Sequence, residues 1–329
     1  MCTNSEDIIN DVLTKRIKMY DDVRRIIEER QGYQCKLPYG PGGDQTGGVG
    51  EEEEIRVNMN VDVDAAVKEA EVQTLKYNVL GNPNWSIQDK MALSARILGR
   101  QGHGETLSGQ ITCRRYNVRM VEDEYAMSML VNPYGKPLEL VTSSDFLEID
   151  GDLNVLSGSG FANKATRFHF HVYAKRADIK CIVHTHPPYS SALSMIGSEL
   201  FISHMDTMAF YEDVQYLSEW PGIPFGDEEG DIISGILSDN YWSALLSHHG
   251  LIVGGRSIEE ATYRAYFFER AAKMQLDALA AVGGDINKLK KTNPNLSRKA
   301  RDWRIHQGPV DAHFNGWAHI ALKEDPSFL

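Results

Sequence analysis

Two histidines at the end of an apolar stretch are the residues with the clearest chemical potential in this 329-residue chain. The segment Cys181–Ser194 reads CIVHTHPPYSSALS and places His184 and His186 two positions apart. If the apolar residues before them end a buried strand, both imidazoles project from the same face, because side chains alternate along a strand. Pro187 and Pro188 then stop that strand, since neither nitrogen can donate to a sheet.

A second histidine-bearing turn lies downstream and strengthens the interpretation of the first pair. Residues Ser247–Gly250 read SHHG and follow the apolar run Trp242–Leu246. Zinc, iron and manganese sites commonly take three neutral imidazoles and leave a position open for water or substrate. The sequence therefore predicts a metal site built from the His-x-His pair and one distant histidine. The simpler alternative is that these histidines are satisfied at strand ends and bind nothing.

Composition and charge exclude several classes of protein. Hydrophobic residues make up 42% and charged residues 24% of the chain, as in ordinary globular proteins. The net charge of −12, without a basic stripe, argues against nucleic-acid binding. An apolar run of about 18 residues, the length that spans a membrane, is absent, and no signal-peptide pattern opens the chain. The four cysteines are scattered, which favours reduced thiols and a cytoplasmic protein.

The chain is expected to divide into three parts. Residues 1–37 form a helical extension, in which a helix capped by Ser5 or Asp7 runs to about Arg30 and carries one apolar stripe. Residues 38–56 form a linker rich in glycine and glutamate. Residues 57–329 form one catalytic domain of the α/β class, in which a central sheet is covered by helices on both faces.

Within that domain, hydrophobic periodicity and turn signals predict the elements that position the histidines. Ser86 with Asp89, and Ser257 with Glu260, are capping boxes that begin two helices, and Glu260 with Arg264 is expected as a surface ion pair. Trp220–Gly230 is expected to be a loop. The expected helices are Val63–Leu80, Ser86–Arg100, Asn163–Arg176, Tyr189–Met195, Asp231–Leu237 and Ser257–Val282. The expected strands are Leu107–Arg114, Ala126–Val131, Leu138–Thr142, Phe146–Ile149, one ending at the His-x-His pair, and Trp242–Ser247.

Four segments together resemble the class II aldolase and adducin family. They are TLSGQITCR, NPYGKPLELVTSSDFLEID, RFHFHVYAKRADIKCIVHTHPPYSSALS and LLSHHGLIVGGRSIEEA. The resemblance covers roughly Val72–Phe328. It implies a three-layer αβα fold with a central, largely antiparallel sheet, and a homotetramer with active sites at subunit interfaces. It also implies one divalent metal ion on His184, His186 and His249, with zinc expected first and Fe(II) or manganese as alternatives.

The chain departs from the family pattern at two places. The family's aldolases carry a proton-transferring glutamate at the position that is Ala165 here. The phosphate-binding pairs of the sugar-phosphate members correspond to Gly109-Gln110 and Asn163-Lys164. Lys164 is a cation that suits a carboxylate as well as a phosphate. We therefore expect a carboxylic acid substrate, bound by Gln110, Asn163 and Lys164.

These features predict a metal-dependent lyase that acts on a small hydroxy- or keto-carboxylic acid. Decarboxylation or retro-aldol cleavage would proceed through a metal-stabilised enolate, and decarboxylation needs no base to begin. The residues expected to transfer protons are His169, Tyr189, His204 and Asp206. Two alternatives stay open: an iron(II)-dependent oxidative decarboxylase on the same fold, and a non-enzymatic, adducin-like scaffold.

Overall fold

The computed structural model describes residues 85–116, 127–222, 227–237 and 241–329. The predicted helical extension 1–37, the linker 38–56 and the helix Val63–Leu80 lie outside these residues, as does the predicted start of the catalytic domain at residue 57.

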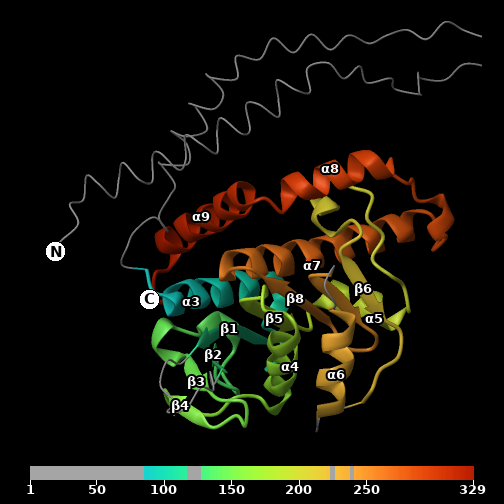
Figure 1. The fold of residues 1–329 in the computed structure, drawn as a ribbon. Helices are drawn as coiled ribbons and strands as arrows, with labels where there is room; N and C mark the ends of the chain where they lie inside the picture. Colours follow the sequence, from blue (N-terminus) through green and yellow to red (C-terminus); the bar gives the residue numbers. More distant parts are fainter. Residues whose placement is uncertain (1–84, 117–126, 223–226, 238–240) are drawn as a thin grey trace, which may run out of the picture. The chain divides into compact units, whose positions relative to one another are not determined.

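An eight-stranded sheet organises the described residues (Figure 1), and its strand order is β4-β3-β2-β1-β5-β8-β7-β6. Neighbouring strands are antiparallel except β6 and β7, which are parallel. The strands are β1 Gln110–Tyr116, β2 Met127–Val131, β3 Leu147–Ile149, β4 Val155–Ser157, β5 Cys181–Thr185, β6 Val214–Leu217, β7 Ser243–Leu246 and β8 Leu251–Gly255. The predicted α/β class and the largely antiparallel sheet are confirmed.

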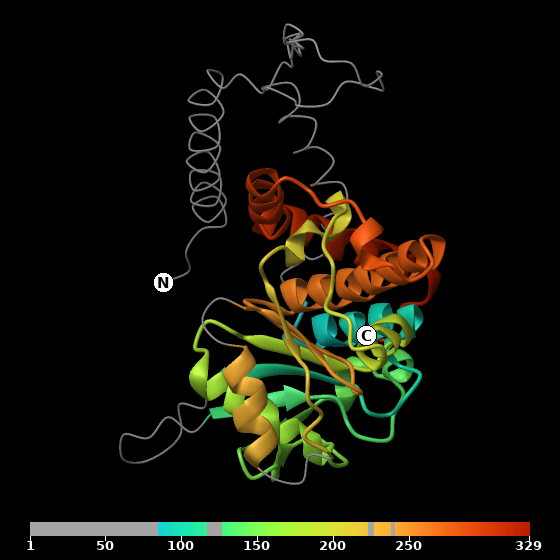
Figure 2. The ribbon, with the colours of Figure 1, turned by 90° about the vertical axis from the view of Figure 1, so that its right-hand side faces the viewer.

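Helices cover both faces of this sheet and make the three predicted layers. On one face α3 and α7 pack directly on the strands, and α8 and α9 lie outside α7 (Figure 2). On the other face α4 and α6 pack against each other and over the strands. The helices are α3 Ile87–Leu98, α4 Arg167–Lys175, α5 Pro188–Met195, α6 Asp227–Ile236, α7 Ile258–Ala281, α8 Pro294–Arg304 and α9 Gln307–Glu324.

Strand β5 lies at the centre of the sheet, and its side chains alternate between the hydrophobic cores on the two faces. Cys181 and Val183 belong to the core under α3 and α7, whereas Ile182 belongs to the core under α4 and α6. His184 lies two residues after Ile182 on the same strand. The centroids of the His184 and Phe168 rings are 5.1 Å apart. The alternation of side chains along a strand therefore directs His184 to the α4 face.

Several predicted elements differ from the structure. Leu138–Thr142 is not a strand: Leu138–Leu140 forms a 3-10 turn closed by the bond from Val141 N to Leu138 O. Helix α6 begins inside the predicted loop Trp220–Gly230. Two further helices follow Asp285: α8 buries Ser297 and Arg304, and α9 buries Val310, Phe314, Asn315, Ala318 and Ala321.

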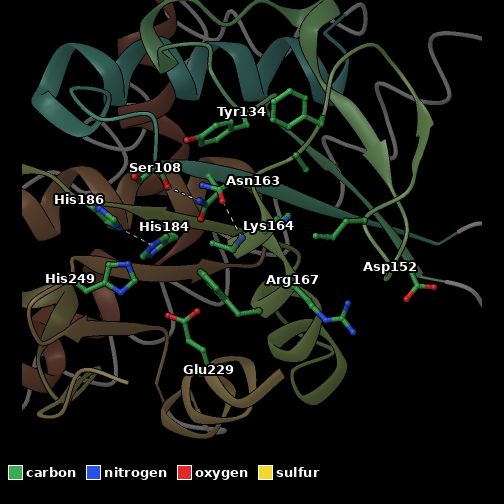
Figure 3. Close-up of a pocket in the computed structure, with 16 residues that line it drawn as sticks. Ser108, Tyr134, Asp152, Asn163, Lys164, Arg167, His184, His186, Glu229 and His249 are labelled. Carbon is green, nitrogen blue, oxygen red and sulfur yellow. Dashed lines mark hydrogen bonds between the residues drawn. The ribbon is translucent and has the colours of Figure 1, made fainter. Parts of the chain in front are cut away.

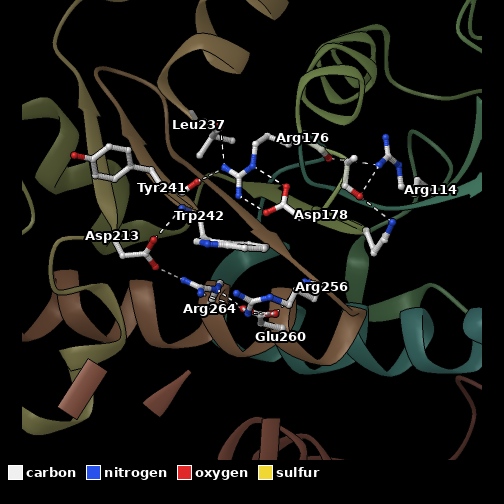
Figure 4. Close-up of polar contacts among 12 residues, drawn as sticks. Arg114, Arg176, Asp178, Asp213, Leu237, Tyr241, Trp242, Arg256, Glu260 and Arg264 are labelled. Atoms are coloured by element: carbon white, nitrogen blue, oxygen red, sulfur yellow. Dashed lines mark hydrogen bonds and ion pairs between the residues drawn. The ribbon is translucent and has the colours of Figure 1, made fainter. Parts of the chain in front are cut away.

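The predicted surface pair Glu260–Arg264 is buried, and Trp242 lies beside it (Figure 4). Arg264 is 0% exposed, and its guanidinium binds Glu260 at 3.0 Å and also pairs with Asp213. Asp213 accepts a hydrogen bond of 2.9 Å from the backbone N of Trp242, the residue before β7. The Trp242 ring lies within 5.3 Å of Arg264 and 4.3 Å of Arg256. This cluster fixes the strand that leads to the second histidine turn.

Candidate metal centre

The three histidines predicted as metal ligands converge on one point. The Nε2 atoms of His184 and His186 lie 3.2 Å apart, and one ligand atom from each of His184, His186 and His249 lies within 4.8 Å of the other two. Two ligands of a tetrahedral zinc ion, each at 2.0–2.1 Å, are separated by about 3.4 Å. The spacing is therefore that of ligands around one metal ion, and the triad can bind a metal.

The backbone of the β7–β8 turn brings His249 to the pair on β5. Strands β5 and β8 pair in register, with Thr185 opposite Leu251. His248 takes a left-handed φ of 53° and is exposed, whereas His249 faces the site. A Cβ on Gly250 would lie 2.4 Å from Thr185 O, so only glycine allows the turn to approach β5 this closely.

Electrostatics favours the neutral, metal-binding form of all three imidazoles. His184 Nδ1 donates to Leu251 O at 2.9 Å, which leaves the Nε2 lone pair directed at the centre. Burial lowers the pKa of His184 well below its usual value, and the neighbouring His249 and His186 lower it further. Burial also lowers the pKa of His186, and that of His249 to about 4. At neutral pH the triad therefore offers nitrogen lone pairs without losing protons.

A cavity of about 770 Å³ opens beside the triad (Figure 3). Its lining includes the three residues predicted to bind the substrate, Gln110, Asn163 and Lys164. It also includes Ala165, which occupies the position of the family's glutamate. The rest of its lining combines polar groups with an aromatic and aliphatic wall. These residues are Ser108, Tyr134, Asp152, Leu153, Phe161, Ala162, Arg167, Phe168 and Glu229.

The predicted substrate-binding residues have distinct local roles. Gln110 is 1% exposed; its Nε2 donates to Ser108 O at 2.6 Å, and its Oε1 has no hydrogen-bond partner among the described residues. Asn163 Oδ1 accepts from Ala165 N at 3.1 Å and so holds the turn that presents Lys164. Gln110 Oε1 is thus a buried acceptor that no described residue satisfies, on a residue that lines the cavity.

The four residues predicted to transfer protons do not line this cavity. His169 is 0% exposed, and its Nδ1 bonds Thr112 Oγ1 at 2.8 Å beneath the pocket. The Tyr189 ring lies on the outer side of α5, with Lys273 Nζ 4.5 Å from its centroid. His204 and Asp206 lie near α8, where Asp206 pairs with Arg304 at 2.6 Å. Within one chain none of the four lines the cavity, although His169 is near enough to His184 to lower its pKa, and their catalytic roles stay predictions.

Glu229 is a pocket residue that the sequence did not indicate. It lies in the first turn of α6, is 5% exposed, and neither carboxylate oxygen has a hydrogen-bond partner among the described residues. Loss of hydration raises its pKa to about 7. It was missed because it lies in the acidic run DEEGD inside the expected loop, where a lone glutamate has no local signature.

Comparison with known proteins places the fold and the triad in one family. The model for the class II aldolase and adducin N-terminal domain matches residues 89–276. This chain therefore belongs to that family, as the sequence motifs predicted. The solved structure of an aldolase II superfamily protein from Pseudomonas syringae is similar with a TM-score of 0.64 and 22% identity. The similarity covers 78% of this chain and 99% of that chain, and it shows the fold.

Two curated relatives from Streptomyces are similar over most of the domain. Decarboxylase NovR of Streptomyces niveus is 26% identical over 71% of this chain and 83% of its own. The 4-hydroxy-3-prenylphenylpyruvate oxygenase/4-hydroxy-3-prenylbenzoate synthase of Streptomyces roseochromogenus subsp. oscitans is 26% identical over 66% of this chain and 77% of its own. Among the described residues, no helix has the length and apolarity to span a membrane.

Proposed function

We propose that this protein is a divalent-metal-dependent carbon–carbon lyase that acts on a small hydroxy- or keto-carboxylic acid. The observation that carries the proposal is the convergence of three neutral imidazoles in a cavity that Lys164 and Arg167 also line. Membership of a family that includes aldolases, and a relative named as a decarboxylase, support the same class of reaction.

Different residues of the pocket would bind different parts of such a substrate. When bound to the triad, the metal supplies a Lewis acid that stabilises negative charge on a chelated carbonyl oxygen. The Lys164 ammonium provides a counter-charge for the substrate carboxylate, and Gln110 Oε1 accepts a hydrogen bond from a substrate hydroxyl. The apolar wall formed by Leu153 and Phe168 holds the carbon skeleton and excludes water.

Decarboxylation is favoured over aldol cleavage because of Ala165. Retro-aldol cleavage begins when a base removes a proton from a hydroxyl, and the Ala165 methyl cannot accept one. Decarboxylation begins with the departure of CO2, which leaves the electron pair on the substrate without a base. The loss of the family glutamate is therefore less damaging to decarboxylation.

A second candidate is oxidative decarboxylation with iron(II) in the same triad. The relative named as an oxygenase favours it, and three imidazoles leave positions open for O2. Dependence of turnover on O2 separates the two reactions. A non-enzymatic, adducin-like scaffold is the third reading, since the family also includes adducins.

The test begins with metal analysis of protein purified without a histidine tag. The chain is then screened with hydroxy- and keto-carboxylic acids in the presence of zinc, manganese or iron(II), with and without O2. We expect His186→Ala to abolish metal binding and turnover together. His248→Ala, which removes the exposed neighbour of His249, should retain both. A wild-type protein that binds none of the three metals would instead favour the scaffold.

A further inference from the structure

The pocket holds a buried carboxylate that has no partner among the residues the structure describes. Glu229 is 5% exposed and makes no ion pair or hydrogen bond with any described residue. Burial of an unpaired carboxylate destabilises a folded protein by several kcal/mol unless its charge is lost or compensated. Buried, unpaired carboxylates of this kind are found where they bind a ligand or take part in a reaction.

Glu229 is close to the metal triad but is not placed as a metal ligand. Its side chain rises from α6 toward the part of the cavity that holds His184 and His249 (Figure 3). The ligand atoms within 4.8 Å of one another come only from the three histidines, as far as the described residues go. Both carboxylate oxygens are buried and unpartnered among the described residues, and the side chain is directed toward the cavity (Figure 3).

We infer that Glu229 is the catalytic residue that carries the proton in this pocket, in place of the glutamate absent at Ala165. Ala165 lies on the turn before α4 and Glu229 on α6, so the carboxylate reaches the same cavity from a different helix. This inference rests on the proposed lyase function. The raised pKa of Glu229, about 7, is consistent with it, because both the acid and the base form are then populated near neutral pH.

The proposed step balances without any further reactant. The bond between the substrate and its carboxylate breaks, CO2 leaves, and the electron pair stays on the organic fragment as an enolate. The Glu229 carboxylic acid gives its proton to the enolate carbon and becomes a carboxylate. A proton from solvent then restores the acid. In the reverse direction the carboxylate removes a proton from carbon next to a carbonyl.

That reverse step provides a test that does not require the natural substrate. Pyruvate and 2-oxobutanoate are small keto acids, and exchange of their C3 hydrogens in D2O reports proton removal without cleavage of a carbon–carbon bond. Exchange is followed by NMR with the zinc-loaded full chain, and zinc affinity is measured separately by calorimetry. The variants are Glu229→Gln, Glu229→Asp and the matched control Glu228→Gln, which makes the same change at the exposed neighbouring residue.

We expect Glu229→Gln to slow exchange at least ~100-fold, the usual loss for a general base, while its zinc affinity stays that of the wild type. Glu229→Asp should retain part of the exchange, and Glu228→Gln all of it. Exchange in Glu229→Gln at more than about a tenth of the wild-type rate would overturn the assignment. So would a loss of zinc affinity of about tenfold or more, which would make Glu229 part of the metal's coordination environment.

Failure of the proposed function has a different signature. If the zinc-loaded wild type exchanges no hydrogen of either acid, enolate chemistry is absent from the site. The lyase proposal is then wrong, and the role of Glu229 is wrong with it. If the wild type exchanges and Glu229→Gln exchanges equally well, only the role of Glu229 is wrong.

Discussion

Ala165 and Glu229 line the same cavity and differ in whether they can hold a proton. We expect Ala165→Glu not to speed the native reaction and to lower turnover. The new carboxylate would compete for the open metal position and repel an acidic substrate, whose counter-charge is the neighbouring Lys164. Steady-state kinetics on any substrate found by the screen measure this. A tenfold gain, about 1.4 kcal/mol of barrier, would show that the site lacked a base it needed.

Lys164→Ala should raise KM more than it lowers kcat, because the proposed role of Lys164 is to pair with the substrate carboxylate and not to act on the reacting bond. Lys175→Ala is the control, since Lys175 lies on α4 and does not line the cavity. Equal KM values for Lys164→Ala and the wild type would place the substrate carboxylate elsewhere in the pocket.

Two buried histidines outside the triad make the metal-free protein sensitive to acid. Burial lowers the pKa of His103 and of His169 to about 3, whereas both return to about 6.5 on unfolding. Below pH 6.5 the unfolded chain therefore binds protons that the folded chain does not. The free energy of unfolding should fall by about 2 kcal/mol per histidine between neutral pH and pH 5.

Urea unfolding of the metal-free protein at the two pH values measures this loss. His169→Gln should lose less stability on acidification than the wild type, since it removes one of the histidines whose pKa burial lowers. His248→Gln, at an exposed position, should behave as the wild type. An unchanged pH dependence in His169→Gln would mean that His169 is not the group that titrates.

At the scale of elements, the approach of the β7–β8 turn to β5 assembles the triad. In Gly250→Ala the new Cβ would meet Thr185 O at 2.4 Å and His186 Cδ2 at 2.8 Å. The turn must move away, and His249 moves with it. We expect zinc affinity to fall by about 10–100-fold, the range seen when supporting residues of a metal site change. Calorimetric titration measures this, and Gly316→Ala, where a Cβ meets nothing within 4 Å, should bind zinc normally.

The buried cluster before β7 gives a second prediction at this scale. Asp213→Asn leaves Arg264, which is 0% exposed, with one carboxylate partner fewer. Breaking a buried pair on one side destabilises proteins by about 3–5 kcal/mol. Glu212→Gln breaks the adjacent pair with Arg298, whose side chains are both 45% exposed, and should change the stability far less. Similar losses in urea unfolding for both variants would contradict the structural role given to the Arg264 cluster.

At the scale of the whole molecule, we propose a homotetramer. Several large apolar side chains of the segment from α5 to Trp220 are exposed in the single chain, among them Met195 at 69%, Met205 at 53% and Trp220 at 50%. Exposed apolar groups that gather in one region mark interaction surfaces. Light scattering of the full chain at micromolar concentration should therefore give four times the 36.9 kDa chain mass. In a monomer, His204 and Asp206 would also have no neighbouring subunit whose metal triad they could reach.

The sequence by itself determined those features that depend on local pattern. The i, i+2 spacing of His184 and His186 and the prolines behind them are sufficient to predict two imidazoles on one face of a strand end. The capping box Ser86–Asp89 is observed, with bonds of 3.1 and 2.7 Å, because both partners lie within one helical turn. Family motifs then indicated the layers and His249 as the third ligand; the layers are observed, and His249 lies beside the His-x-His pair.

Only the tertiary structure decided which charged groups are buried and what faces the cavity. Glu260–Arg264 has the spacing of a surface pair, yet it is buried and the Trp242 ring packs on Arg264. Glu229 lies in an acidic run typical of a solvated loop, yet the packing of α6 against α4 buries it beside the triad. Burial depends on which elements meet across long sequence distances. The pattern of residues within a single turn contains no information about those contacts.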